Sequence, residues 1–147
     1  MLKVSVVILL LIIFTVVIHY ECLRFLSDQL FKLTTHRRVH LLMSVFGALV
    51  AHVIEIWLFA LTFYVLLHYG GWGALEGSAN HSLADCFYFS ISNYTSLGMG
   101  DIQPLGVMRY VSGFEALLGL VLITWSASFL FLEMQKIWGS NVQNARD

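Results

Sequence analysis

A short glycine-rich stretch is the part of the chain whose residue types and spacing could do chemistry. It reads TSLGMGD over residues 95–101. A cation that sheds its water needs replacement oxygens, and consecutive backbone carbonyls supply them when they all point the same way. Such a backbone passes through conformations that favour glycine, because glycine tolerates positive φ. Gly98 and Gly100 provide this freedom, so the stretch indicates a cation site built from main chain.

A second set of chemical groups interrupts an otherwise apolar run. His52 and Glu55 are three residues apart and therefore share one helix face. They could serve as a pH sensor or as metal ligands, but two ligands per chain make no metal site unless symmetry or another helix adds more. Alternatively, they form a buried hydrogen-bonded pair that locks this helix to the next one, where Ser90, Ser92 and Asn93 offer partners.

A third polar group lies in the last apolar run. Glu115 is expected behind the glycine-rich stretch, either paired with Arg109 of a neighbouring copy or hydrogen-bonded between helices. Gly119 follows one turn later, where a glycine allows close helix packing.

The composition defines the environment of these groups. Of 147 residues, 59% are hydrophobic and only 12% are charged, against about 25% in soluble domains. These values exclude an ordinary soluble globule and a disordered chain. The net charge of -1 gives no basic footprint for nucleic acid. Two cysteines make no disulfide scaffold. We therefore expect a membrane protein.

The hydrophobic pattern predicts an all-α membrane protein with helices that position the glycine-rich stretch. A spanning helix needs about 20 apolar residues, whereas the run before the stretch is about half that length and suits a re-entrant helix. A cleaved signal peptide is the alternative for the first run, but small residues at a cleavage site are missing. The expected segments are a first helix at 1–20, a linker at 21–38, an outer helix at 39–69, a short pore helix at 83–95, the stretch itself at 96–101, an inner helix at 107–135 and a tail at 136–147.

Basic residues set the expected orientation, because they favour the cytoplasmic side. The linker carries four of them: Arg24, Lys32, Arg37 and Arg38. Residues 70–106 carry no basic residue and are therefore expected outside. The N-terminus is then external and the C-terminus cytoplasmic. The linker is either an amphipathic helix on the membrane surface or a simple helical connector.

The glycine-rich stretch and its frame resemble the potassium-channel superfamily. The pore signature of that family is T-x-x-G-[YF]-G-D, and here a proline, Pro104, follows the Asp by three residues. The resemblance covers roughly residues 39–135 and implies a small two-helix pore with an extra N-terminal helix. It implies four identical copies around one axis, with potassium as the bound ion. The implied ion-binding residues are Ser96, Leu97, Gly98, Met99 and Gly100. The resemblance also implies that Gly119 lies near the hinge of the inner helix, with close helix packing as the alternative.

The match departs from the family where the aromatic residue normally stands. Met99 occupies that position and cannot donate a hydrogen bond from its side chain. Tyr88 and Phe89 stand where the aromatic partners of the family would be and are expected to pack on it. Asp101 resembles the family's mouth carboxylate, held by Ser92 or by water, or merely solvated. Thr95, just before the stretch, completes the predicted filter support.

These observations lead to three classes of function. The first is a homotetrameric cation channel that conducts potassium, or that discriminates weakly between sodium and potassium because of Met99. The second is a channel-like subunit that regulates without conducting. The third, ranked last, is a membrane enzyme that uses His52 and Glu55 with a metal. Apart from permeant cations no cofactor is expected, and the expected partners are copies of the chain, lipid and an unseen regulatory protein.

Overall fold

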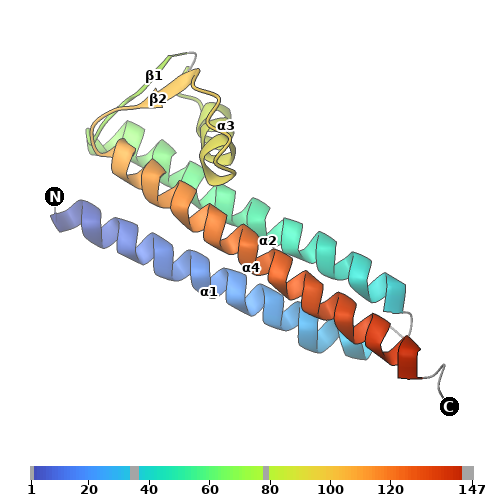
Figure 1. Ribbon diagram of the computed structural model, residues 1–147. Coiled ribbons are helices and arrows are strands. Elements are labelled where there is room, and N and C mark those ends of the chain that lie inside the picture. The colour runs from blue at the N-terminus through green and yellow to red at the C-terminus, as the bar shows by residue number, and fades with distance from the viewer. Residues whose placement is uncertain (1, 34–36, 78–79, 144–147) are drawn as a thin grey trace.

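Three long helices lie side by side, and a short helix with two strands packs against two of them near one end (Figure 1). The computed structural model describes residues 2–33, 37–77 and 80–143. The helices are α1 (Leu2–Leu33), α2 (Arg37–Val65), α3 (Leu83–Tyr94) and α4 (Met108–Gln143). A π-helical turn, η1 (Leu66–Gly70), extends α2, and the strands are β1 (Leu75–Gly77) and β2 (Ile102–Pro104).

The first helix is longer than the sequence pattern predicts. Instead of ending near residue 20, α1 continues to Leu33 through most of the expected linker. His19 is therefore not at an interfacial helix end but in the middle of α1, where it is fully buried. Residues 34–36 of the expected linker and residues 144–147 of the expected tail lie outside the described residues. The helix α4 extends into the expected tail as far as Gln143.

One face of α1 packs against α2 and α4. Its buried positions follow helical spacing: Ile8, Thr15, His19, Leu23 and Leu26. The approach to α2 is close at Gly47, where an added Cβ would lie 2.3 Å from the Leu26 side chain. A small residue at such a crossing lets two membrane helices approach each other closely. The extra N-terminal helix is therefore packed on the rest of the chain.

The three long helices have the character of membrane spans. Among the described residues, the candidate spans are Ser5–Asp28, Arg38–Tyr69 and Met108–Lys136. Large apolar side chains remain exposed along all three, for example Phe14, Phe46 and Leu117. Exposed apolar surface on this scale is unfavourable in water and suits lipid or further protein. The chain is a membrane protein, as its composition predicts.

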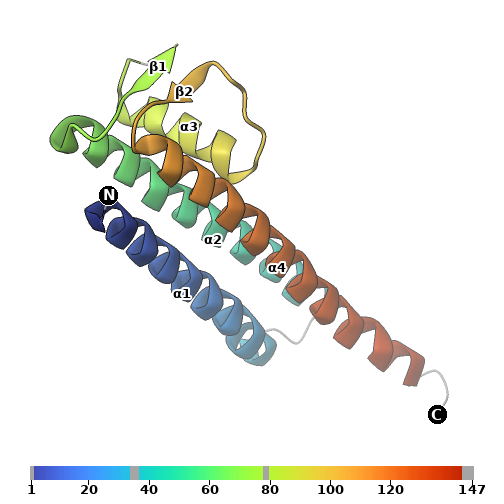
Figure 2. The ribbon, with the colours of Figure 1, turned by 60° about the vertical axis from the view of Figure 1, so that its left-hand side comes forward.

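The short helix α3 begins with a capping box and leads to the glycine-rich stretch. The Ser82 hydroxyl accepts from the Asp85 amide, and the Asp85 carboxylate accepts from the Ser82 amide. The Ser82 hydroxyl also donates to the Asp85 carboxylate, and this bond, followed by the one from the Ser82 amide, lowers the pKa of Asp85. Beyond the stretch, β2 pairs antiparallel with β1 and brings the residues before and after α3 together (Figure 2).

Candidate functional site

The backbone of the glycine-rich stretch alternates between ordinary and left-handed conformations. The φ angles are +57° at Ser96, +56° at Gly98 and +81° at Gly100. Glycine adopts such angles without strain, whereas a serine does so at some cost. Every second residue of the stretch thus has positive φ, the pattern that turns successive carbonyls toward the same side.

Ser92, near the end of α3, holds this backbone in place. Its carbonyl accepts hydrogen bonds from the amides of Leu97, at 2.9 Å, and Gly98, at 3.2 Å. Its hydroxyl accepts a third bond, from the Met99 amide at 3.1 Å. The amides of three successive residues are therefore all hydrogen-bonded to Ser92, which lies behind the stretch.

The other side of the stretch is open. All residues from 95 to 100 are exposed in the single chain, and the side chains of Leu97 and Met99 keep more than half of their surface. The amides of residues 97–99 are bound by Ser92 of α3, but one chain can contact an ion from one side only. A cation could be coordinated from all sides only if further copies of the chain brought the same stretch to a common axis.

The Ser92 hydroxyl binds the Met99 amide rather than the carboxylate of Asp101 at the end of the stretch. Tyr88 of α3 lies close to this carboxylate, and desolvation together with the neighbouring Asp101 raises the pKa of Tyr88. Ser92 thus fixes the backbone before Asp101.

The comparison with protein families decides the identity of this arrangement. A family model described as "Ion channel" matches residues 51–136, which is more than half of the chain. The chain belongs to this ion channel family. It is a potassium-channel-like, two-helix type with an additional N-terminal helix. Among curated proteins and among solved structures, no match to the chain was found.

The aromatic residue Phe89 of the channel does not pack on Met99. It is buried against Phe63 of α2, with ring centroids 5.0 Å apart in an edge-on arrangement. The Met99 side chain instead remains exposed in the single chain. The expectation that both aromatic residues pack behind position 99 is therefore wrong for Phe89, which belongs to the core between α2 and α3.

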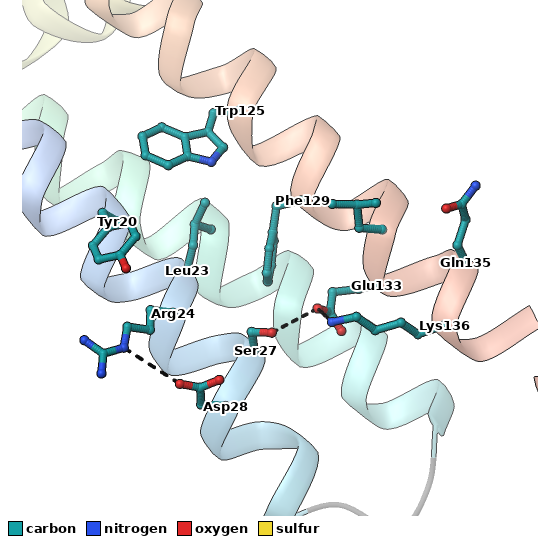
Figure 3. A pocket seen from close by; sticks show the side chains of 11 residues that line it. Tyr20, Leu23, Arg24, Ser27, Asp28, Trp125, Phe129, Glu133, Gln135 and Lys136 are labelled. Carbon is teal, nitrogen blue, oxygen red and sulfur yellow. Dashed lines mark hydrogen bonds and ion pairs between the residues drawn. The ribbon is translucent and has the colours of Figure 1, made fainter.

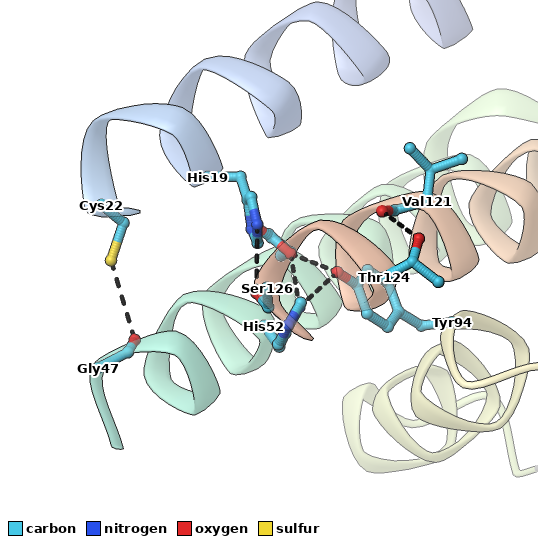
Figure 4. A network of polar contacts seen from close by, with 9 residues as sticks. His19, Cys22, Gly47, His52, Tyr94, Val121, Thr124 and Ser126 are labelled. Atoms are coloured by element: carbon cyan, nitrogen blue, oxygen red, sulfur yellow. Dashed lines mark hydrogen bonds and ion pairs between the residues drawn. The ribbon is translucent and has the colours of Figure 1, made fainter. Parts of the chain in front are cut away.

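Glu55 of the channel is the centre of a buried polar cluster. Its carboxylate contacts His19 Nδ1 at 2.8 Å and His52 Nδ1 at 3.2 Å, and it accepts a hydrogen bond from the Tyr94 hydroxyl. Ser126 lies 3.3 Å from the other ring nitrogen of His19 (Figure 4). Four helices thus contribute to one cluster, which we call the Glu55 cluster.

The sequence pattern identifies only His52 and Glu55 of this cluster. It predicts partners on α3, but the partner there is Tyr94 rather than Ser90, Ser92 or Asn93. Because the expected first helix ends at residue 20, the pattern places His19 at a helix end and gives it no partner. The signal that could have identified it is its place on the helical face formed by Thr15, His19 and Leu23, since that face is buried.

Glu115 lies behind α3, the helix that precedes the stretch, and its partner belongs to the same chain. The Ser90 hydroxyl donates to Glu115 Oε1 at 2.5 Å and also contacts the Ile56 carbonyl at 2.8 Å. Glu115 is fully buried and makes no ion pair within the described part of the chain. Of the two alternatives, the hydrogen bond between helices is present, and it joins α4 to α3.

Gly119 lies where α4 crosses the end of α3. An added Cβ at this position would lie only 2.1 Å from the Tyr94 carbonyl oxygen. The contact requires glycine for packing, which is the alternative to a hinge. The end of α3 is consequently held from two sides, by Gly119 and by the Glu55 cluster.

A groove lies at the other end of the channel chain, between α1 and α4. It encloses about 660 Å³, and Figure 3 shows the polar side chains that line it. The Ser27 hydroxyl donates to Glu133 at 3.2 Å, and Lys136 contacts the same carboxylate at 2.6 Å. The Ser27–Glu133 contact connects α1 to α4 far from the glycine-rich stretch, whereas Lys136 and Glu133 both belong to α4.

Proposed function

We propose that the chain forms a homotetrameric channel that conducts potassium passively down its gradient. Residues 96–100 of four copies would surround one axis, and the carbonyls of Ser96, Leu97, Gly98 and Met99 would replace the water of the ion. The Ser96 hydroxyl and Gly100 complete the proposed ion sites.

The observation that carries this proposal is the backbone of the stretch. Positive φ at Ser96, Gly98 and Gly100 alternates with ordinary angles, while Ser92 binds the amides in between. Amides that are held from behind leave the carbonyls free to face a cation. The exposure of the whole stretch in one chain supports its burial among several copies.

The orientation of α3 favours the same ion charge. The carboxyl end of a helix carries a partial negative charge, and Tyr94 at this end of α3 directly precedes the stretch. Asp85 in the first turn balances the opposite, positive end. Asp101, at the mouth, would raise the local concentration of cations.

The proposed location is the cell membrane, with the N-terminus outside and the C-terminus in the cytoplasm. This orientation places Arg24 and Lys32 on the cytoplasmic side and the basic-poor segment from 70 to 106 outside. Lipid and three further copies of the chain are the proposed partners, and a regulatory protein remains a further one.

Two variants of the proposal depend on Met99. A methionine is flexible and offers no side-chain donor, so the ring of carbonyls could adjust to smaller ions and conduct sodium as well as potassium. Alternatively, the chain assembles with other subunits and regulates them without conducting. The first variant is favoured by the exposed, unanchored Met99 side chain.

Reconstitution tests these alternatives. We would incorporate the purified protein into liposomes and measure currents in potassium–sodium gradients, together with the assembly mass by native mass spectrometry. A tetramer whose reversal potential follows the potassium gradient supports the proposal. A reversal potential near zero supports weak selectivity. A lack of cation flux at any gradient or pH, with an intact assembly, favours the regulatory subunit.

A further inference from the structure

We infer that the Glu55 cluster is a binding site for a divalent transition metal such as Zn²⁺. The ligands are His19 of α1 with His52 and Glu55 of α2. His52 and Glu55 alone are too few for a metal site, and the fold supplies the missing third ligand from a helix 36 residues away in sequence. The inference does not depend on the ion selectivity of the channel.

The distances between the ligand atoms suit a small ion. One ligand atom each from His19, His52 and Glu55 lies within 4.8 Å of the other two. His19 Nδ1 lies 2.8 Å from Glu55 Oε1, and His52 Nδ1 lies 3.2 Å from the other carboxylate oxygen, Oε2. Zinc bonds of about 2.0–2.1 Å in a tetrahedral arrangement place ligand atoms about 3.3 Å from one another. Small side-chain movements would therefore convert the hydrogen bonds into metal bonds.

The donor set selects the class of metal. Two imidazoles with one carboxylate match a set that zinc uses in proteins, whereas calcium and magnesium prefer oxygen ligands throughout. Imidazole also suits copper, nickel and iron, so zinc is the representative of this class. The Tyr94 hydroxyl, 2.8 Å from His52 Nδ1, stands next to the fourth position, where it or a water could complete the tetrahedron.

The surroundings of the ligands orient them for this role. A histidine that binds metal through one nitrogen usually donates from the other to a nearby acceptor. When His19 Nδ1 binds the metal, its Nε2–H can donate to the Ser126 hydroxyl at 3.3 Å. The Tyr94 hydroxyl is hydrogen-bonded to the Glu55 carboxylate. A partner is thus in place for a ligand on α1 and for one on α2.

Access and burial fit a site that holds its ion. The side chains of His19 and Glu55 are completely buried, whereas that of His52 keeps 13% of its surface exposed. The metal could therefore enter past His52. A buried carboxylate is costly in an apolar environment unless it is paired, and a divalent ion would neutralise it.

The consequence of binding would be a firmer connection between α1 and the helix before the glycine-rich stretch. The metal would join α1 and α2 directly, and Tyr94 would extend the connection to the end of α3. Metal that binds only the folded state raises its stability in proportion to the logarithm of the metal concentration.

Metal binding to the untagged protein tests the inference. The protein would be depleted with a chelator and dialysed against Zn²⁺, and bound zinc would be measured by elemental analysis. We expect one Zn²⁺ per chain. His19→Gln and His52→Gln should each weaken binding by more than about 100-fold, because even residues that only orient ligands contribute about 10–100-fold. His68→Gln is the matched control, since His68 is exposed and its polar and ring contacts among the described residues are with Tyr64 alone.

A second measurement remains valid if a ligand variant fails to fold. Co²⁺ bound to the unmodified protein should give the intense visible absorption of a four-coordinate ion, and Tyr94→Phe should reduce affinity by about 10–100-fold. Zinc content no higher than that of the dialysis buffer would overturn the inference and leave a hydrogen-bonded cluster. Equal affinity in the His19, His52 and His68 variants, or the weak spectrum of six-coordinate Co²⁺, would overturn it as well.

Discussion

Gly119 of α4 lies directly against the carbonyl oxygen of Tyr94, the last residue of α3. A Cβ at position 119 would come within 2.1 Å of that oxygen, which is backbone and cannot turn away like a flexible side chain. Six residues earlier on α4, Gly113 has no atom within 4 Å of such a Cβ. Two glycines of one helix are therefore under very different constraints.

Gly119→Ala should displace the end of α3, and Gly113→Ala should not. We expect the first substitution to destabilise the protein by about 1–3 kcal/mol, as overpacking does. The second should stabilise α4 by up to about 1 kcal/mol, because alanine favours helix more than glycine. Unfolding in mixed micelles, followed by circular dichroism, measures both. Equal stability of the two variants would refute the packing role of Gly119.

Alanine at Gly98 or Gly100 should abolish ion flux without preventing assembly. Both positions have positive φ and empty space around a Cβ, so the cost is backbone strain of about 1–2 kcal/mol and not a clash within the chain. Gly71→Ala is the matched control, because Gly71 has φ +57° and equally open surroundings away from the stretch. Liposome flux should persist in this control. Unchanged flux in the other two variants would remove the filter assignment.

Met99→Tyr should increase selectivity for potassium over sodium. A tyrosine could donate a hydrogen bond from behind the stretch and hold the carbonyls at a fixed spacing, which methionine cannot do. Met99→Leu is the control for side-chain size without a donor. Reversal potentials in mixed gradients provide the measurement. If Tyr and Leu at this position shift the reversal potential equally, the hydrogen bond does not control selectivity.

Ser90→Ala should weaken the contact between α3 and α4. The variant leaves the buried Glu115 carboxyl without its hydroxyl partner, which costs about 1–3 kcal/mol. Ser128→Ala serves as control, since Ser128 is exposed and its hydroxyl donates to the Thr124 carbonyl of its own helix. Unfolding in micelles should separate the two variants, and an identical stability would argue against the role of Glu115 in packing.

The capping box of α3 should make the start of this helix sensitive to acid. The pKa of Asp85 is lowered by its hydrogen bonds in the folded state, so its contribution to stability is present above the usual pKa of 3.8 and is lost as the pH falls through the lowered value. Asp85→Asn should remove this dependence. Hydrogen exchange of the first turn of α3 at neutral and at low pH measures it. If these amides of the parent protein are protected from hydrogen exchange equally at low and at neutral pH, this account is contradicted.

The local parts of the fold could be predicted from the sequence. The start of α3 at Leu83, its end near Thr95 and the positive φ at Gly98 and Gly100 all follow from residues that are neighbours in the chain. The match to the ion channel family over residues 51–136 agrees with the resemblance that the sequence shows over roughly residues 39–135. A strong short-range pattern was sufficient there because capping and glycine conformation are decided locally.

Long-range pairings could not be predicted in the same way. A histidine in an apolar run fits a membrane interface as well as a buried partner, and only the fold places His19 beside Glu55. The sequence allows Phe89 to pack either behind Met99 or against α2, and in the structure it packs against Phe63 of α2. The β1–β2 pairing joins three-residue segments that are too short to give a periodic signal.

The pairing of β1 with β2 closes the segment between them into a loop, and the two paired strands form the base of this loop. Leu75 lies opposite Pro104 and Gly77 opposite Ile102, whose side chain is buried in the core. A shift by one residue would turn Ile102 outward, because neighbouring strand residues face opposite sides. Insertions or deletions in the turn before α3 would keep this base intact, whereas one within either strand would change the position of Asp101. The segment from β1 to β2 can therefore change its length before α3 without moving Asp101, whereas a change of length within the strands would move it.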